Sequence, residues 1–110
     1  MRTIIDITKD DKGYDLFFSL TDYNGEAVNL NGVSSILFKA QVPGESELKF
    51  SGEMNIIDSP GGEVKYTVQE GDFDEAGKYY AEIEATFEDG QLVTYGDIVI
   101  NCKSDLPKAV

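Results

Sequence analysis

Carboxylates are the only reactive side chains that this sequence holds in number, because the 110-residue chain contains 21 Asp and Glu but one Cys and no His. Without His, imidazole cannot serve as a general base, a metal ligand or a pH switch. The lone Cys102 cannot form an intramolecular disulfide or a zinc site built from several cysteines. A serine nucleophile would lack its histidine, and the chain has no Gly-x-Ser-x-Gly motif. We therefore expect the protein not to be an enzyme.

Two short acidic clusters carry the oxygen atoms that a hard cation such as Ca²⁺ prefers. They consist of Asp10, Asp11 and Asp15, and of Asp72, Asp74 and Glu75. Neither cluster has the spacing of a calcium loop with its glycine and closing glutamate. Carboxylate pairs also hydrolyse glycosides, but the chain has no Trp to build a sugar-stacking cleft. We interpret the clusters as solvated loop acids and expect no catalytic residue, metal or cofactor.

The charge balance is strongly acidic, with 9 Lys and Arg and a formal net charge of -12. Nucleic-acid binding needs cations that replace the counterions of the phosphates, so we expect no nucleic-acid partner. An anionic membrane surface would repel the chain for the same reason. An excess of acid of this size instead favours docking onto basic surfaces of partner proteins.

The N-terminal residues do not have the pattern of a signal peptide, because the apolar stretch Thr3-Ile4-Ile5 ends at Asp6. A signal peptide needs about 7–15 apolar residues in its central region, and a membrane span needs about 20. With one thiol and no leader, we expect the chain to be made and folded in a reducing cytoplasm.

Apolar residues recur at a period of two along almost the whole chain, which predicts β-strands. The expected strands cover residues 2–8, 14–22, 33–42, 48–58, 63–69, 78–88 and 91–102, with a short extended link at 28–32. Within 48–58, a break or bulge is expected at Ser51-Gly52, with Met54 and Ile56 as the inward pair.

Turn signals separate these strands at intervals of about 8–12 residues, which is typical of antiparallel β-sandwiches. Asn24-Gly25 predicts a turn with positive φ at both residues, and Asp89-Gly90 predicts a tight hairpin. The only helical candidate is a single turn at residues 73–76. We predict one all-β domain over residues 1–102, with about seven or eight strands, and a flexible tail over 103–110.

The segment around Tyr79 narrows the class of sandwich. Immunoglobulin-type domains have a Tyr near the start of the sixth strand, and its hydroxyl bonds to the backbone of the preceding corner. Tyr79 has that position here, with Gly77 expected to allow the tight approach and Ala81 expected in the core two residues later. The alternative is an ordinary core tyrosine. The corner favours an immunoglobulin-like fold.

Several motifs in a fixed order then resemble one known family. The stretch from Asp15 to Val33 contains a strand, a D-x-N-G turn and a V-x-L-x-G link. The motifs that follow it are Gly61-Gly62-Glu63-Val64, Gly71-Asp72, Ala76-Gly77-Lys78-Tyr79 and Phe87-Glu88-Asp89-Gly90. Over residues 3–101 the chain resembles the immunoglobulin-like N-terminal module of bacteriophage baseplate upper proteins and related phage tail and head-fibre proteins.

The resemblance implies a non-enzymatic virion structural protein, made in the host cytoplasm. Such a module packs against other phage structural proteins and is present in multiple copies. In baseplate upper proteins the module precedes a long region for trimerisation and attachment of the receptor-binding protein, whereas this sequence stops. The resemblance therefore implies a tail or baseplate adaptor, a capsid decoration protein or a fibre component. The alternative is an interaction or carbohydrate-binding module of a bacterial surface system.

The outer face of the hairpin formed by residues 78–88 and 91–102 is the candidate docking surface. A two-residue turn at Asp89-Gly90 sets the expected pairing across the hairpin. The predicted pairs are Glu84 with Tyr95, Glu82 with Asp97, and Tyr80 with Val99, and Val93 is expected on the same face.

Two hypotheses remain for this face. The first is a partner-binding surface formed by all seven residues, with an apolar centre and acids that would meet Lys or Arg of the partner. The second is a solvated sheet face, or a bulge at Gly96 that shifts the register. Such a bulge would remove the unfavourable pairing of Glu82 with Asp97.

Overall fold

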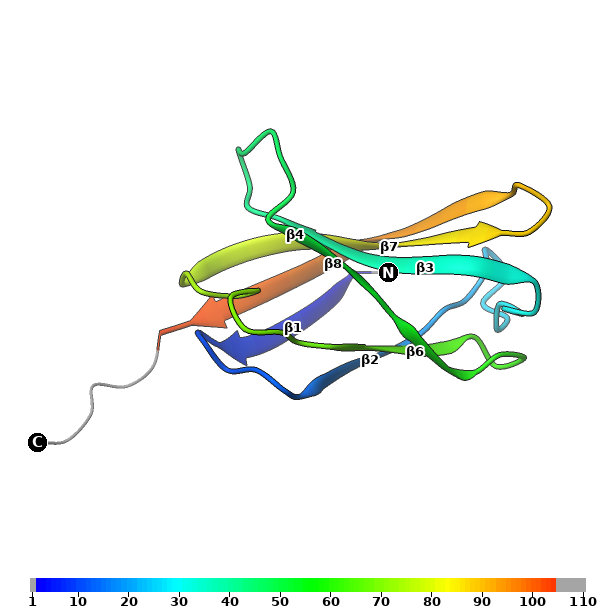
Figure 1. The fold of residues 1–110 in the computed structure, drawn as a ribbon, viewed down its shortest axis with the longest axis horizontal. Helices are drawn as coiled ribbons and strands as arrows, with labels where there is room; N and C mark the ends of the chain where they lie inside the picture. The colour runs from blue at the N-terminus through cyan, green and yellow to red at the C-terminus, as the bar shows by residue number, and fades with distance from the viewer. Residues whose placement is uncertain (1, 105–110) are drawn as a thin grey trace, which may run out of the picture.

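The computed structural model describes residues 2–104, so most of the expected tail, residues 105–110, lies outside the described residues. Eight strands form two stacked β-sheets (Figure 1). The strands are β1 (Thr3–Thr8), β2 (Asp15–Ser19), β3 (Val33–Gln41), β4 (Phe50–Glu53), β5 (Asn55–Asp58), β6 (Glu63–Thr67), β7 (Gly77–Phe87) and β8 (Leu92–Lys103). Residues 73–76 form turns and bends rather than the expected helical turn. No helix that could span a membrane occurs in residues 2–104.

The strand order defines the class of sandwich. One sheet has the order β1-β8-β7-β3-β4, and the other has the order β2-β6-β5. Strand β1 runs parallel to β8, and all the other pairs are antiparallel. In immunoglobulin lettering, β8-β7-β3-β4 is the G-F-C-C′ sheet, and β2-β6-β5 is the B-E-D sheet. The prediction of an immunoglobulin-like all-β sandwich is confirmed.

The core lies between the two sheets and follows the period of two. In β7, Tyr79, Ala81, Ile83 and Ala85 are buried, as their alternation predicts. Phe38 of β3 lies at the centre, where aromatic rings from both sheets meet. Its ring centroid is 4.9 Å from that of Tyr66, 5.6 Å from that of Phe18 and 6.0 Å from that of Phe50.

The expected strand at residues 48–58 is wrong in one respect, because the chain changes sheets within it. Strand β4 pairs with β3 and β5 pairs with β6, so the break falls at Met54 instead of Ser51-Gly52 (green ribbon, Figure 1). A Cβ at Gly52 would lie 2.6 Å from the Tyr66 ring, so this glycine makes room for a core aromatic. Met54 is buried as predicted, whereas Ile56 stays 39% exposed at the edge of its sheet.

The turn at Asn24-Gly25 also differs from the prediction, since only Gly25 has a positive φ. The loop has three residues, and the Asp22 amide donates to the Glu26 carbonyl at 2.8 Å. The Asp22 side chain accepts hydrogen bonds from the amides of Asn24 and Glu26. This side-chain capping favours a longer loop than the two-residue turn.

Candidate partner-docking face

The β7–β8 hairpin has a three-residue loop, which moves the pairing at its tip by one residue. The Phe87 amide donates to the Gln91 carbonyl at 2.8 Å, and the Asp89 side chain accepts from the Gln91 amide at 2.9 Å. Glu84 consequently pairs with Thr94. The predicted pair of Glu84 with Tyr95 is therefore wrong.

A bulge in β8 then restores the predicted register farther along the hairpin. Ala81 pairs with Ile98 and Ile83 pairs with Tyr95, so the single residue Glu82 lies opposite both Gly96 and Asp97. The predicted direct pair of Glu82 with Asp97 does not form. The bulge at Gly96, one of the two alternatives in the second hypothesis, is present, and Asp97 within it has a φ of 65°.

Beyond the bulge, two of the predicted residues remain close together. Tyr80 pairs with Val99, as expected. Tyr80 is 50% exposed, whereas Val99 is only 6% exposed, because β1 lies beside β8 and brings Ile4 next to Val99. The expectation that Val99 is an exposed residue of this face is therefore wrong.

Tyr95 and Val93 do not belong to the outer face. They pair with the buried residues Ile83 and Ala85, so the one-residue shift turns their side chains toward the core. Tyr95 packs against the hydrophobic core, and its burial raises the pKa of its hydroxyl, with a smaller contribution from the Asp22 carboxylate.

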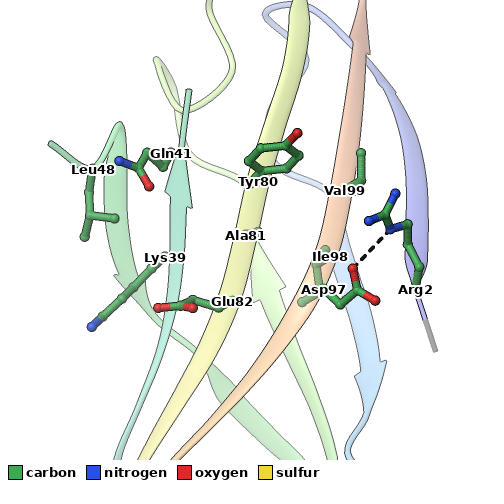
Figure 2. A pocket seen from close by; sticks show the side chains of 10 residues that line it. All are labelled: Arg2, Lys39, Gln41, Leu48, Tyr80, Ala81, Glu82, Asp97, Ile98 and Val99. Carbon is green, nitrogen blue, oxygen red and sulfur yellow. Dashed lines mark hydrogen bonds and ion pairs between the residues drawn. The ribbon is translucent and has the colours of Figure 1, made fainter. Parts of the chain in front are cut away.

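Four of the predicted residues, Tyr80, Glu82, Asp97 and Val99, line a groove together with side chains from β3, from the residue before β1 and from the loop between β3 and β4. The fifth, Glu84, stays on the outer face but does not line the groove. The groove has a volume of about 290 Å³, and we call it the Tyr80 groove. Its lining side chains are Arg2, Lys39, Gln41, Leu48, Tyr80, Glu82, Asp97 and Val99, with Ala81 and Ile98 beneath them. Figure 2 shows Tyr80 in the middle, between Gln41 on one side and Val99 on the other.

Sequence reasoning missed the residues that come from outside the hairpin. Lys39 and Gln41 alternate with the buried residues Phe38 and Ala40, so the sequence does place their side chains on an outer face. Nothing in the sequence pairs β3 with β7, and that pairing sets Gln41 beside Tyr80 and Lys39 beside Glu82.

The charges around the Tyr80 groove are partly neutralised. Arg2 donates to the Asp97 carboxylate at 3.0 Å, and Lys39 donates to the Glu84 carboxylate at 2.6 Å. Among the described residues, Glu82 forms no ion pair, and its side chain is exposed. The groove therefore combines an aromatic centre with an available carboxylate.

The interpretation of both acidic clusters as solvated loop acids is wrong for Asp72, which is buried, and for Asp15, which begins β2. Buried Asp72 accepts hydrogen bonds from the Tyr66 hydroxyl at 2.5 Å and from the Gln69 amide at 2.9 Å. Asp15 accepts from Thr67 and Lys65, which lowers its pKa. Within residues 2–104, no group of three or more His, Cys, Asp and Glu side chains could hold a metal ion.

Tyr79 stabilises the corner before β7. Its hydroxyl donates to the Glu75 carbonyl at 2.7 Å, and the hydroxyl oxygen accepts a hydrogen bond from the Glu75 amide at 3.3 Å. This is the contact that defines a tyrosine corner in immunoglobulin-like sandwiches. Gly77 has a φ of 136°, and a Cβ there would meet nothing within 4 Å. A glycine is therefore needed at position 77 for its positive φ. The expectation that Gly77 allows another part of the chain to approach closely is wrong.

The buried tyrosines predict a loss of stability at alkaline pH. Burial raises the pKa of Tyr14, Tyr66, Tyr79 and Tyr95, and in Tyr66 the hydrogen bond to Asp72 adds to the effect. Above the ordinary pKa of about 10, the unfolded chain loses tyrosine protons that the folded chain keeps. The unfolded state then binds fewer protons, so the free energy of unfolding falls as the pH rises.

A spectrophotometric titration combined with circular dichroism measures this effect. We expect the absorbance of these tyrosinates to develop together with unfolding above pH about 10. Tyr66→Phe should reduce the alkaline loss of stability. Reversible ionisation of all six tyrosines near pH 10, with the strand signal retained, would contradict the expectation.

The fold and the groove together define an immunoglobulin-like β-sandwich with a candidate surface for binding another protein. The chain belongs to the BppU N-terminal domain family, whose model matches residues 1–106. This is a family of phage baseplate structural proteins, and the family resemblance found in the sequence is confirmed. No curated protein matches the chain. Among solved structures, murine CRIg matches with 14% identity and a TM-score of 0.42, over 94% of this chain and 92% of that chain.

Proposed function

We propose that this domain is a non-enzymatic docking module of a phage virion, and that the Tyr80 groove binds another structural protein of the capsid, tail or baseplate. The family membership supports a virion location and structural partners. The observation that carries the site is Tyr80 itself, an aromatic residue that is 50% exposed in the middle of a central strand. The module would act in multiple copies, since baseplates are built from repeated subunits.

Tyr80 has the properties of a binding hot spot. Tyrosine is enriched at interface centres because its ring supplies apolar contact area and its hydroxyl supplies a hydrogen bond. Around it, Leu48 and Ile4 supply exposed apolar surface. Burying this surface against a partner would remove Tyr80 from water without a change of the fold.

The charges indicate which partner surface fits. The chain carries a formal net charge of -12, and Glu82 extends an exposed carboxylate into the Tyr80 groove. A partner with an apolar patch flanked by Lys or Arg is complementary to this arrangement, and the long-range attraction would speed association.

A pull-down from a phage-infected lysate of the source, with captured proteins identified by mass, tests the proposal. We expect a capsid, tail or baseplate protein in the eluate. Tyr80→Ala should weaken its binding by about 30-fold or more, which corresponds to about 2 kcal/mol. Phe17→Ala is the matched control, because Phe17 is an exposed aromatic residue on the outer face of the other sheet.

The two variants separate the outcomes. Loss of binding with Tyr80→Ala and full binding with Phe17→Ala support the proposal. Equal binding by the two variants and the wild type would refute the site. Capture of cell-wall glycan or bacterial surface proteins in place of virion proteins would refute the virion role and favour an interaction module of a bacterial surface system.

A further inference from the structure

The first part of β3 has a partner strand on one side only. Strand β4 pairs with β3 from Leu37 to Ala40, and one more hydrogen bond joins the Met54 amide to the Ile36 carbonyl. Beyond Met54 the chain leaves for the other sheet, where β5 pairs with β6. In the described part of the chain, residues 33–35 therefore have β7 on one side and no strand on the other.

The same stretch of β3 contains a bulge at Ser34, on the side that faces β7. The register of β3 against β7 shifts between Val33 and Ser35, so Ser34 has no Cα partner in β7. The extra residue of a bulge is left out of the ladder of backbone hydrogen bonds. Its side chain donates to the Thr86 carbonyl at 3.0 Å, which fixes the bulge without covering the edge.

A second groove runs along this free edge. It has a volume of about 270 Å³, and we call it the β3-edge groove. Residues 33–36 and 53–56 line it. One wall is the edge of β3, and the other is the segment that crosses from β4 to β5. An extended chain that entered the groove would lie beside residues 33–35 of β3, on the side of β3 where β4 pairs farther along the strand.

The chemistry of the β3-edge groove indicates the kind of segment that fits. Unpaired backbone groups at a sheet edge bind an extended chain through main-chain hydrogen bonds, and alternate side chains then determine specificity. Ile56 offers exposed apolar surface, and Glu53 is exposed and acidic. No Lys or Arg lines the groove.

We propose that the β3-edge groove binds an extended, basic segment of a partner protein, which adds as a strand to the free edge of β3. The segment alternates apolar residues toward Met54 and Ile56 with Lys or Arg toward Glu53. A second copy of this chain does not fit, because each copy carries a net charge of -12 and the two would repel. The site lies at a strand edge, apart from the Tyr80 groove, and does not depend on the proposed function of that face.

Selection from a library of random twelve-residue peptides on the immobilised domain tests this inference. We expect the enriched peptides to alternate apolar and basic residues. N-methylation of single peptide amides should abolish binding at every second position only, because alternate amides of a strand point to opposite edges. Hydrogen exchange of the amides in residues 34–35 should slow when an enriched peptide is bound.

Matched variants locate the peptide. Ile56→Thr should weaken binding at least about fivefold, and Glu53→Lys about tenfold. The controls Ile57→Thr and Glu63→Lys should bind like the wild type, since both residues are exposed but neither lines the groove. Tyr80→Ala should also bind peptide normally, which separates this result from the test of the Tyr80 groove.

Three results would overturn the inference. The first is a library that yields no enriched peptide. The second is a loss of binding when neighbouring peptide amides are N-methylated alike, and the third is an equal effect of a groove variant and its control. Loss of peptide binding with Tyr80→Ala would assign the peptides to the other face and would also overturn it.

Discussion

Phe38→Ala is expected to lower the free energy of unfolding by about 3–5 kcal/mol, the usual cost of removing a buried aromatic side chain. Phe38 has 0% exposure and lies at the centre of the sandwich, where its ring contacts Phe18, Phe50 and Tyr66. The cavity would border both sheets, and the rigid β-strands around it can close it only in part. A domain of this size has a total stability of about 5–15 kcal/mol, so the loss is a large fraction of the whole.

Urea denaturation followed by circular dichroism measures this change. Phe17→Ala makes the same substitution one residue away from Phe18, at a side chain that is 66% exposed. It should cost less than about 1 kcal/mol, since little apolar surface is lost from the core. A loss below about 1.5 kcal/mol for Phe38→Ala, or equal losses for the two variants, would show that the core is not centred on Phe38.

Gly62→Ala should be the most damaging of the glycine substitutions, with a loss of about 3 kcal/mol or more. Gly62 has a φ of 68°, which an alanine adopts only at a cost. An added Cβ would also lie 2.7 Å from the Leu20 carbonyl oxygen and 2.8 Å from that of Val28. These are backbone atoms, so relief of the clash would break the hydrogen bond from the Leu20 amide to the Gly62 carbonyl.

Gly25→Ala is the control that separates the clash from the backbone strain. Gly25 has a φ of 81°, and a Cβ there would meet nothing within 4 Å. Gly25→Ala should lower the free energy of unfolding by about 1 kcal/mol, the cost of placing an alanine at a positive φ. Both variants are compared by thermal and urea unfolding. Equal losses would mean that the turn before β6 relaxes freely, contrary to the close packing of Gly62 against the backbone of Leu20 and Val28.

Local periodicity predicts most of the fold, because each strand buries alternate residues whatever its neighbours are. The alternation of Tyr79, Ala81, Ile83 and Ala85 identifies β7 and its inner face directly. The change of sheets at Met54 is different. A period of two continues on both sides of Met54, so the pattern carries no information about which sheet each half joins. Gly52 looks like a bulge signal, although its role is to make room for the ring of Tyr66.

The candidate site was harder to predict, because it depends on register. Capping of the Gln91 amide by Asp89 lengthens the hairpin loop, and one added residue is enough to turn Tyr95 to the other face. Gln41 reaches Tyr80 only through the pairing of β3 with β7, two strands that are distant in sequence. Tyr80 itself was predicted, because its position depends only on the alternation within β7.

The most direct test of the proposed docking function is photo-cross-linking in assembled particles. Tyr80 is replaced by a photoreactive phenylalanine analogue in phage particles that contain this chain, and a second sample carries the analogue at Phe17. Our account predicts an adduct from position 80 with another virion structural protein, and little or none from position 17. Adducts from both positions alike, or from position 17 only, would show that the domain does not dock through the Tyr80 groove.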